Sequence, residues 1–143
     1  MDESFHYQLM VVHTLFQDRA MQILDNADLS PGQPKVLDYL NNHDGSMQKE
    51  IAFACHIDPA TITGILNRME AKGLIKRQIQ PDNRRAFNIY LTNLGRKKCD
   101  LVAKTFSHLE HFIFSGISKQ EQLQFMNTLY KLCSNLTDER GLP

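Results

Sequence analysis

Apolar side chains recur every three or four positions near the start of the chain, which predicts a helix over residues 5–24. The stripe comprises Leu9, Val12, Phe16, Ala20 and Ile23. A second helix is predicted to begin in Ser30-Pro31-Gly32-Gln33, which combines a capping box with proline at the first helical position. This helix is expected to end at about Asn42.

The next two predicted helices are short and follow each other closely. Ser46 is expected to cap a helix that runs to about Ala54. Asp58 is a good N-cap for a further helix, and Pro59 suits its first position. Its apolar face comprises Ile62, Ile65, Leu66 and Met69. Gly73 follows that face at the place where a left-handed C-cap is favoured.

Alternating apolar and polar residues then predict a β-hairpin. Its strands are expected at roughly 74–79 and 86–91, on either side of a turn at 80–83. Two consecutive arginines, Arg84 and Arg85, are expected at the exposed tip. Two short helices followed by such a hairpin are typical of a winged helix-turn-helix.

Two longer helices are predicted after the hairpin. Thr92 is expected to cap a helix that reaches about Phe114, and Ser118 to open the last one. The apolar positions of the terminal helices are spread too widely around the circumference for one small core. We therefore expect helices from both ends of the chain to pack against a second copy.

The predicted fold class is mainly α with a small β-hairpin wing. The chain of 143 residues is expected to form a single domain over 1–143. A winged-helix DNA-binding region is expected at about 30–92, with dimerisation helices at 1–26 and 96–140.

Charge is unevenly distributed along a chain whose formal net charge is zero. Between Asp58 and Lys98, nine lysines and arginines face three acids, so this segment carries +6 and the remainder −6. A basic stretch in a neutral chain indicates that one part of the molecule meets a polyanion. The alternative is a solvated face with a chance bias in charge.

Cysteine usage and hydropathy indicate the compartment. Cys55, Cys99 and Cys133 are far apart and odd in number, which makes a disulfide framework or zinc knuckle a poor explanation. They are expected to be buried, unreactive thiols. No targeting signal or membrane-spanning run is recognisable, so we expect a soluble, cytoplasmic protein.

Three segments, "LSPGQPKVLDYL", "ITGILNRMEAKGLIKR" and "DNRRAFNIYLTNLG", occur in an order and at a spacing that resemble the MarR family of winged-helix transcriptional regulators. The resemblance spans nearly the whole chain. It implies a homodimer, joined by its terminal helices, that binds double-stranded DNA. It implies no cofactor and no enzymatic activity. A repressor that responds to a small molecule is the expected function.

The resemblance implies a recognition helix over about 58–72 that enters the major groove. The DNA-contacting residues expected on it are Ala60, Thr61, Thr63, Gly64, Asn67, Arg68 and Lys72. Small residues there let the backbone approach base edges closely, and threonine methyls can meet thymine methyls. Alternatively, the two threonines serve only the start of the helix. Family members often have arginine where Gly64 stands.

The resemblance also implies that the wing enters the minor groove, where Arg85 corresponds to the family's groove-binding arginine. A narrow A·T-rich groove attracts arginine strongly. Arg77 and Arg84 complete the expected contact set. The alternative is a pair of solubilising arginines. The family commonly has aspartate two residues before that arginine, where this chain has Asn83, so Asp82 is the candidate to brace the arginines instead.

Some MarR-like proteins sense small aromatic acids, metals or oxidants. The family's pocket implies His13, Phe16 and Tyr39 as lining residues, with the effector unidentified. His108, Glu110 and His111 could supply metal ligands, since the two histidines share one helix face, and His6 or His13 could join them from the first helix. The third and fourth ligands are not clear, and Lys35 stands where the zinc-sensing branch has a ligand. The cysteine of the peroxide-sensing branch is absent near Phe5.

Two other classes of function explain the sequence less well. An enzyme would need a nucleophile with an orienting base, and the chain has neither a strand-to-helix elbow nor a glycine-rich loop. A winged helix that contacts only protein would leave the small outer face of the recognition helix and the basic wing without explanation.

Overall fold

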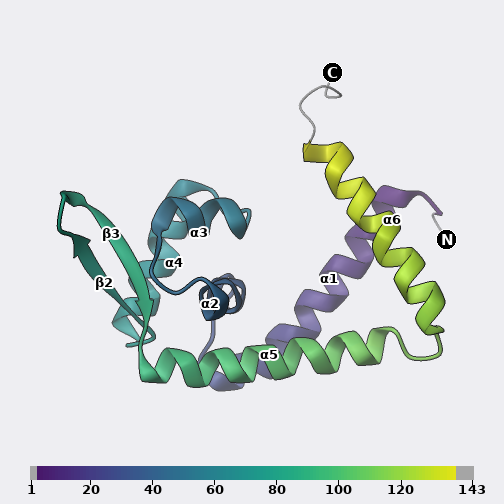
Figure 1. Ribbon diagram of the computed structural model, residues 1–143. Coiled ribbons are helices and arrows are strands. Elements are labelled where there is room, and N and C mark those ends of the chain that lie inside the picture. Colours follow the sequence, from purple (N-terminus) through teal and green to yellow (C-terminus); the bar gives the residue numbers. More distant parts are fainter. Residues whose placement is uncertain (1–2, 138–143) are drawn as a thin grey trace. The chain divides into compact units, whose positions relative to one another are not determined.

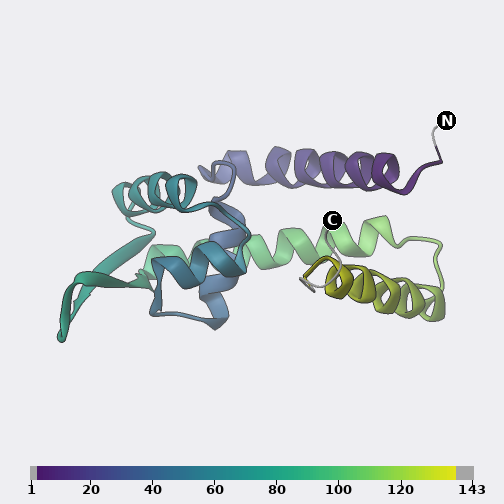
Figure 2. The ribbon, with the colours of Figure 1, turned by 90° about the horizontal axis from the view of Figure 1, so that it is seen from above.

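The computed structural model describes residues 3–137, which are drawn in colour in Figure 1 and, from above, in Figure 2. They form two compact units, one ending at Leu109 and one beginning at Glu110. It confirms a mainly helical chain with a small antiparallel sheet. The elements are α1 (Phe5–Leu24), a 3-10 turn (Asp25–Ala27), α2 (Gln33–Asn42), β1 (Ser46–Met47), α3 (Gln48–Ala54), α4 (Pro59–Ala71), β2 (Ile75–Gln80), β3 (Asn83–Leu91), α5 (Asn93–Ile113) and α6 (Lys119–Thr137).

The core of the first unit lies between α2, α3, α4 and the base of the sheet. Its largest fully buried side chains include Leu37, Leu40, Ile51, Ile62, Leu66, Met69 and Ile89. The apolar face predicted for α4 is therefore the buried face. Because each of these helices is short, most of its stability comes from burying that face against its neighbours.

The predicted bounds of α1 agree with the structure, but its apolar stripe is only partly covered. Ala20 and Leu24 are buried, and Phe16 is half-buried against the ring of Phe106 on α5, with 6.0 Å between ring centroids. Leu9 and Val12 are exposed, as are Phe5, Met10 and Leu15.

Helix α2 begins two residues later than predicted, at Gln33. Pro31 and Gly32 occupy the centre of a tight turn closed by the Gln33 amide, which donates to the Ser30 carbonyl at 3.1 Å. Gly32 has a φ of +87°, so the turn is of the type that favours Pro followed by Gly. The proline in the first turn of α2 is Pro34, not Pro31.

The predicted cap of α3 is also wrong, because Ser46 belongs to a strand. Ser46 and Met47 form β1, which pairs with Ile89 and Asn88 of β3. The Ser46 hydroxyl donates to the His43 carbonyl at 2.6 Å. At the start of α3, the Glu50 carboxylate instead accepts from the Met47 amide at 2.7 Å.

The start and end of α4 are as predicted. Asp58 caps the helix, and Gly73 follows it with a φ of +73°, a left-handed conformation that glycine adopts at little cost. The other predicted caps are also confirmed, because Thr92 accepts from the Gly95 amide at 3.0 Å and Ser118 from the Glu121 amide at 3.2 Å.

The wing is longer than predicted, since β2 reaches Gln80 and β3 begins at Asn83. The two strands are the edge and centre of a three-stranded sheet ordered β1-β3-β2. Ile79 pairs with Phe87, whereas Gln80 pairs with Asn83, so residues 84–86 bulge from the ladder. Arg84 and Arg85 therefore lie within β3 beside the tip, not on the loop itself.

The second unit is built around α6, whose described residues include none that is buried. Phe114 and Phe125 make an edge-on ring contact with 6.2 Å between centroids. Leu123, Phe125, Met126, Tyr130 and Leu136 are exposed. The prediction that Cys133 is a buried thiol is wrong for the single chain, because its side chain is exposed.

Candidate nucleic-acid interface

The N-terminus of α4 is anchored by contacts between Asp58 and Thr61. The Asp58 carboxylate accepts from the Thr61 amide at 2.9 Å and from its hydroxyl at 2.6 Å. These hydrogen bonds favour the ionised form and hold the pKa of Asp58 below its usual value. The hydroxyl of Thr61 therefore serves the start of the helix, the alternative that the sequence left open.

Thr63, one turn further, is similarly engaged. Its hydroxyl donates to the Pro59 carbonyl at 3.0 Å and accepts from Gln48 Nε2 of α3 at 2.8 Å. The side chain is nevertheless exposed, so its methyl group remains free for an apolar contact. The Gln48 contact also ties the two helices of the helix-turn-helix together at the surface.

The outward face of α4 is built from small and polar side chains. Ala60, Asn67, Arg68 and Ala71 are exposed, opposite the buried apolar face. A Cβ added to Gly64 would lie 3.2 Å from Nη1 of Arg68. The guanidinium of Arg68 thus lies over the only helical position on this face without a side chain, which brings a cation close to the helix backbone.

Arg77 lies at the base of the wing and is bound to the recognition helix. Its guanidinium forms an ion pair with Glu70 and donates to Asn67 Oδ1 at 2.8 Å. The side chain is only 16% exposed. The sequence placed Arg77 among DNA contacts, but its donors are directed at α4.

Lys72, expected to contact DNA, also has partners within the protein. Its ammonium group donates to the Asp28 carbonyl at 2.7 Å and lies 3.2 Å from the Asp28 carboxylate. Ser30 Oγ and Gln33 Oε1 lie 3.4 and 3.3 Å away. The end of α4 is therefore linked to the segment between α1 and α2.

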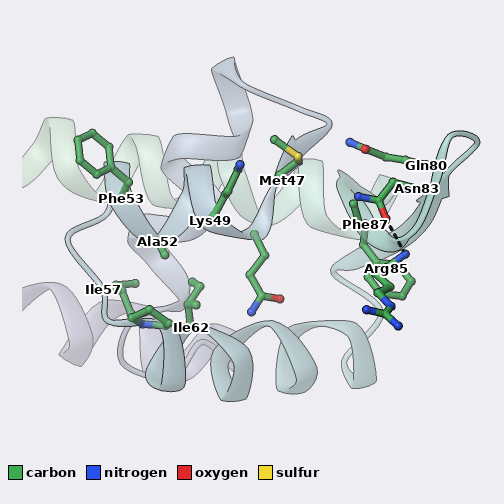
Figure 3. A pocket seen from close by; sticks show the side chains of 13 residues that line it. Met47, Lys49, Ala52, Phe53, Ile57, Ile62, Gln80, Asn83, Arg85 and Phe87 are labelled. Carbon is green, nitrogen blue, oxygen red and sulfur yellow. Dashed lines mark hydrogen bonds between the residues drawn. The ribbon is translucent and has the colours of Figure 1, made fainter.

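The two arginines of the wing have no such partners. The side chains of Arg84 and Arg85 are exposed and form no hydrogen bond or ion pair within residues 3–137. Asn83 Oδ1 accepts from the backbone amide of Arg85 at 3.1 Å, drawn as the dashed line in Figure 3. The brace near the arginines is thus Asn83, and it holds the backbone.

Arg85 borders a groove between the wing, α3 and the start of α4, with a volume of about 790 Å³ (Figure 3). Its lining includes Met47, Gln48, Lys49, Phe53, Pro59, Arg85 and Phe87. Lys49, which the sequence analysis did not select, adds a cation on α3. Lys49 lies outside the basic Asp58–Lys98 segment, so the charge distribution along the sequence did not indicate it.

The basic residues at the start of α5 are mostly engaged. Arg96 forms an ion pair with Asp44 at 2.7 Å, and Lys98 donates to the Ala27 carbonyl at 2.6 Å. They stabilise the packing of loops on α5. Some cations of the Asp58–Lys98 segment face solvent and have no partner within residues 3–137. These cations are therefore concentrated near α4 and the wing.

A second hollow, of about 520 Å³, lies between α1, α2 and the start of α4. Its lining includes His13, Asp18, Met21, Lys35, Thr61 and Phe106. Of the three expected pocket residues, His13 lines this hollow, whereas Phe16 does not line it but packs against Phe106, which does. Tyr39 lines a separate hollow and stacks on His43, with 4.5 Å between ring centroids.

The remaining candidate chemistry is distributed over the fold. Cys55 and Cys99 are buried, and their thiols donate to the carbonyls of Lys35 and Leu37. Burial raises the pKa of both thiols, that of Cys99 to about 11. Within residues 3–137 no three histidine, cysteine or acidic side chains are grouped to hold a metal ion. No helix of that range is both long and apolar enough to cross a bilayer.

Comparison with known proteins matches residues 29–87 to the model of the MarR family. The chain is 31% identical over 117 residues to a putative transcriptional regulatory protein for the hcr operon of Thauera aromatica, covering 82% of this chain and 70% of that protein. It is 26% identical to the transcriptional repressor MdtR of Bacillus subtilis, covering 92% and 86%.

The fold gives the same result. A DNA complex of MepR from S. aureus superimposes with a TM-score of 0.87 and 28% identity, covering 94% of this chain and 99% of that one. Matches in sequence and fold that extend well beyond the helix-turn-helix agree with the expectation from the sequence motifs. The chain belongs to the MarR family of winged-helix, DNA-binding transcriptional regulators.

Proposed function

We propose that the protein is a homodimeric, ligand-responsive repressor that binds a pseudo-palindromic operator. Each subunit places the outer face of α4 in the major groove and its wing in an adjacent minor groove. The proposal includes no catalytic reaction. Two such subunits, related by a two-fold axis, match half-sites about one helical turn apart.

The observation that carries the proposal is the pair of exposed, unpartnered arginines on β3. Arg85 borders the same groove as Pro59, so a wing arginine and the start of the recognition helix face one space. Arginine placed where a duplex would pass can neutralise phosphate and enter a narrow minor groove. The small outer face of α4 allows the helix backbone to approach base edges.

The apolar surfaces of the terminal helices support a homodimer. Phe5, Leu9, Val12 and Leu15 of α1 are each between 47% and 61% exposed. A similar series lies along α6, where none of the described residues is buried. Exposed apolar surface of this extent marks an interface, and a second copy of the chain supplies the matching surface.

Repression and ligand response are supported by the hollow beside α1 and by the relatives. The hollow combines apolar side chains with Lys35 and His13, a composition that suits a small molecule with a polar or anionic group. Because Thr61 of α4 also lines it, a ligand there could alter the placement of the recognition helix. MdtR is named a repressor, which favours the same role here.

Electrophoretic mobility shift at two salt concentrations tests the proposal, with operator sequences obtained by selection from random duplexes. Affinity should fall with a log–log slope of roughly −0.9 for each phosphate neutralised. Selected duplexes should contain paired half-sites. Binding to no duplex at either salt concentration would refute DNA recognition, and binding without any enriched sequence would refute a specific operator.

A further inference from the structure

We propose that Asn67 is a base-reading residue that presents its amide nitrogen to DNA, and that Arg77 and Glu70 determine this orientation. Arg77 is accordingly a positioning residue and not a DNA contact. The inference rests on the proposed function, since it names a specificity determinant of the same interface.

The geometry consists of three side chains joined in sequence across two elements. Glu70 and Asn67 lie on neighbouring turns of α4, and Arg77 approaches from β2. One terminal nitrogen of Arg77 pairs with Glu70, and the other donates to Asn67 Oδ1 at 2.8 Å. Arg77 is held in a partly buried place, where a two-point contact of arginine is geometrically specific.

The orientation of the asparagine amide follows from the chemistry of its partner. A guanidinium has only N–H donors, so the amide atom facing Arg77 must be the oxygen. The Asn67 nitrogen is then the free end of the amide, and it has no hydrogen-bond partner within residues 3–137. Without Arg77, rotation of the terminal amide by 180° would exchange the two atoms.

A fixed donor has a defined preference among bases in the major groove. The usual pairing of asparagine with adenine uses the amide oxygen to accept from N6. Here that oxygen faces Arg77. Guanine presents only acceptors, N7 and O6, whereas cytosine presents an amino group. The orientation of Asn67 therefore favours guanine, whose two acceptors exceed the single O4 acceptor of thymine, and disfavours cytosine at the position that it meets.

The surroundings of Asn67 allow the amide to reach a base edge. Gly64, one turn before it, and Ala71, one turn after it, have little or no side chain. Neither competes with the amide for the groove. Asn67 is exposed on this face, opposite the buried Leu66 and Met69.

The test compares base preference at every position of the operator half-site for four proteins, which are the wild type, Asn67→Asp, Arg77→Met and Lys76→Met. Asn67→Asp keeps an oxygen for Arg77 but has no donor. At one position of each half-site, it should lose about tenfold or more on guanine and gain relative preference for cytosine. The other positions should keep their preferences.

Arg77→Met retains an unbranched apolar stem but releases the amide. The preference for guanine over adenine should narrow by about tenfold at the position that Asn67→Asp identifies, because the freed amide can pair with adenine. Lys76→Met is the matched control, since the exposed Lys76 loses the same charge without contacting Asn67. It should weaken all sequences alike. Circular dichroism checks that every variant is folded.

Each adverse result has a separate meaning. Unchanged base preferences in Asn67→Asp would overturn the role of Asn67. If Arg77→Met and Lys76→Met both weakened all duplexes equally, Arg77 would act only through its charge, and the positioning role would be overturned. If the wild type selected no sequence, the proposed function itself would fail. The wild type alone establishes that outcome, without the variants.

Discussion

The ammonium group of Lys72 donates to the backbone carbonyl of Asp28 at 2.7 Å, which ties the C-cap residue of the recognition helix to the segment between α1 and α2. Asp28 has a left-handed backbone with a φ of 60°, and its carboxylate lies 3.2 Å from the same nitrogen. Lys98 of α5 holds the adjacent Ala27 carbonyl. Two lysines from different helices therefore fix this short segment.

Lys72→Met should lower the free energy of unfolding by about 1–2 kcal/mol, because the Asp28 carbonyl loses its charged donor. The ion pair adds little, since the Asp28 carboxylate is exposed. DNA affinity should fall, because the end of the recognition helix loses its link to the segment between α1 and α2. The salt dependence of that affinity should stay unchanged, since the Lys72 ammonium group contacts protein and not phosphate. Urea unfolding and titrations at several salt concentrations measure both. A slope smaller by about one per subunit would instead make Lys72 a phosphate contact.

Arg85→Ala should cost about 1–3 kcal/mol of operator binding, the range expected for a specific arginine contact. The loss should be largest with A·T-rich flanks, where the minor groove is narrow. Arg84→Ala should cost less and act alike on all sequences, as a phosphate contact does. Operators with A·T and G·C flanks separate the two effects. If both variants lost the same affinity whatever the flanking sequence, Arg84 and Arg85 would act only through their general positive charge.

Two helical glycines should respond in opposite ways to alanine. Gly64→Ala should raise the free energy of unfolding by about 0.5–1 kcal/mol, because its Cβ would meet only the flexible end of Arg68. It should weaken DNA binding if the α4 backbone approaches base edges. Gly95→Ala should destabilise by about 1–3 kcal/mol, since its Cβ would lie 2.0 Å from the Leu74 carbonyl oxygen. Thermal unfolding and mobility shift distinguish the cases.

Leu123→Asp should convert a dimer into monomers. Leu123 is 63% exposed on α6, so the charge costs the single chain little but would be buried in a subunit interface. Sedimentation at micromolar concentration measures the assembly, and Lys119→Ala at the start of the same helix is a control. A wild-type monomer under these conditions would refute the dimer.

Stability should decline in alkali through the buried thiols. Burial raises the pKa of Cys99 from 9.0 to about 11, so the folded state binds a proton that the unfolded state releases. This contribution is fully present below pH 9 and is lost as the pH rises towards 11. Cys99→Ala should remove about 1–2 kcal/mol of that decline by about pH 10.5. Urea unfolding of the wild type and of Cys99→Ala from pH 7 upward provides the measurement. An identical decline of stability in both proteins would contradict the role of Cys99.

Local signals were sufficient for most helix boundaries. Asp58-Pro59, Gly73, Thr92 and Ser118 act on the backbone within three or four residues, so their effects are legible in the sequence. The starts of α2 and α3 differ from the prediction for another reason. Ser46 pairs with β3, a strand more than 40 residues away, instead of capping α3. Ser30-Pro31-Gly32 forms a turn, so α2 begins after it.

The sequence by itself determined the fold class, the buried face of α4 and the presence of a basic wing, because periodicity and turn chemistry are local properties. Only the tertiary structure decided which cations remain available. Lys72 is paired with Asp28, 44 residues away, and Arg77 of β2 with Glu70 and Asn67 of α4, whereas Arg84 and Arg85 have no partner within residues 3–137. The sequence identifies a charged residue but does not show whether its charge is paired. Pairing depends on which elements the fold brings together.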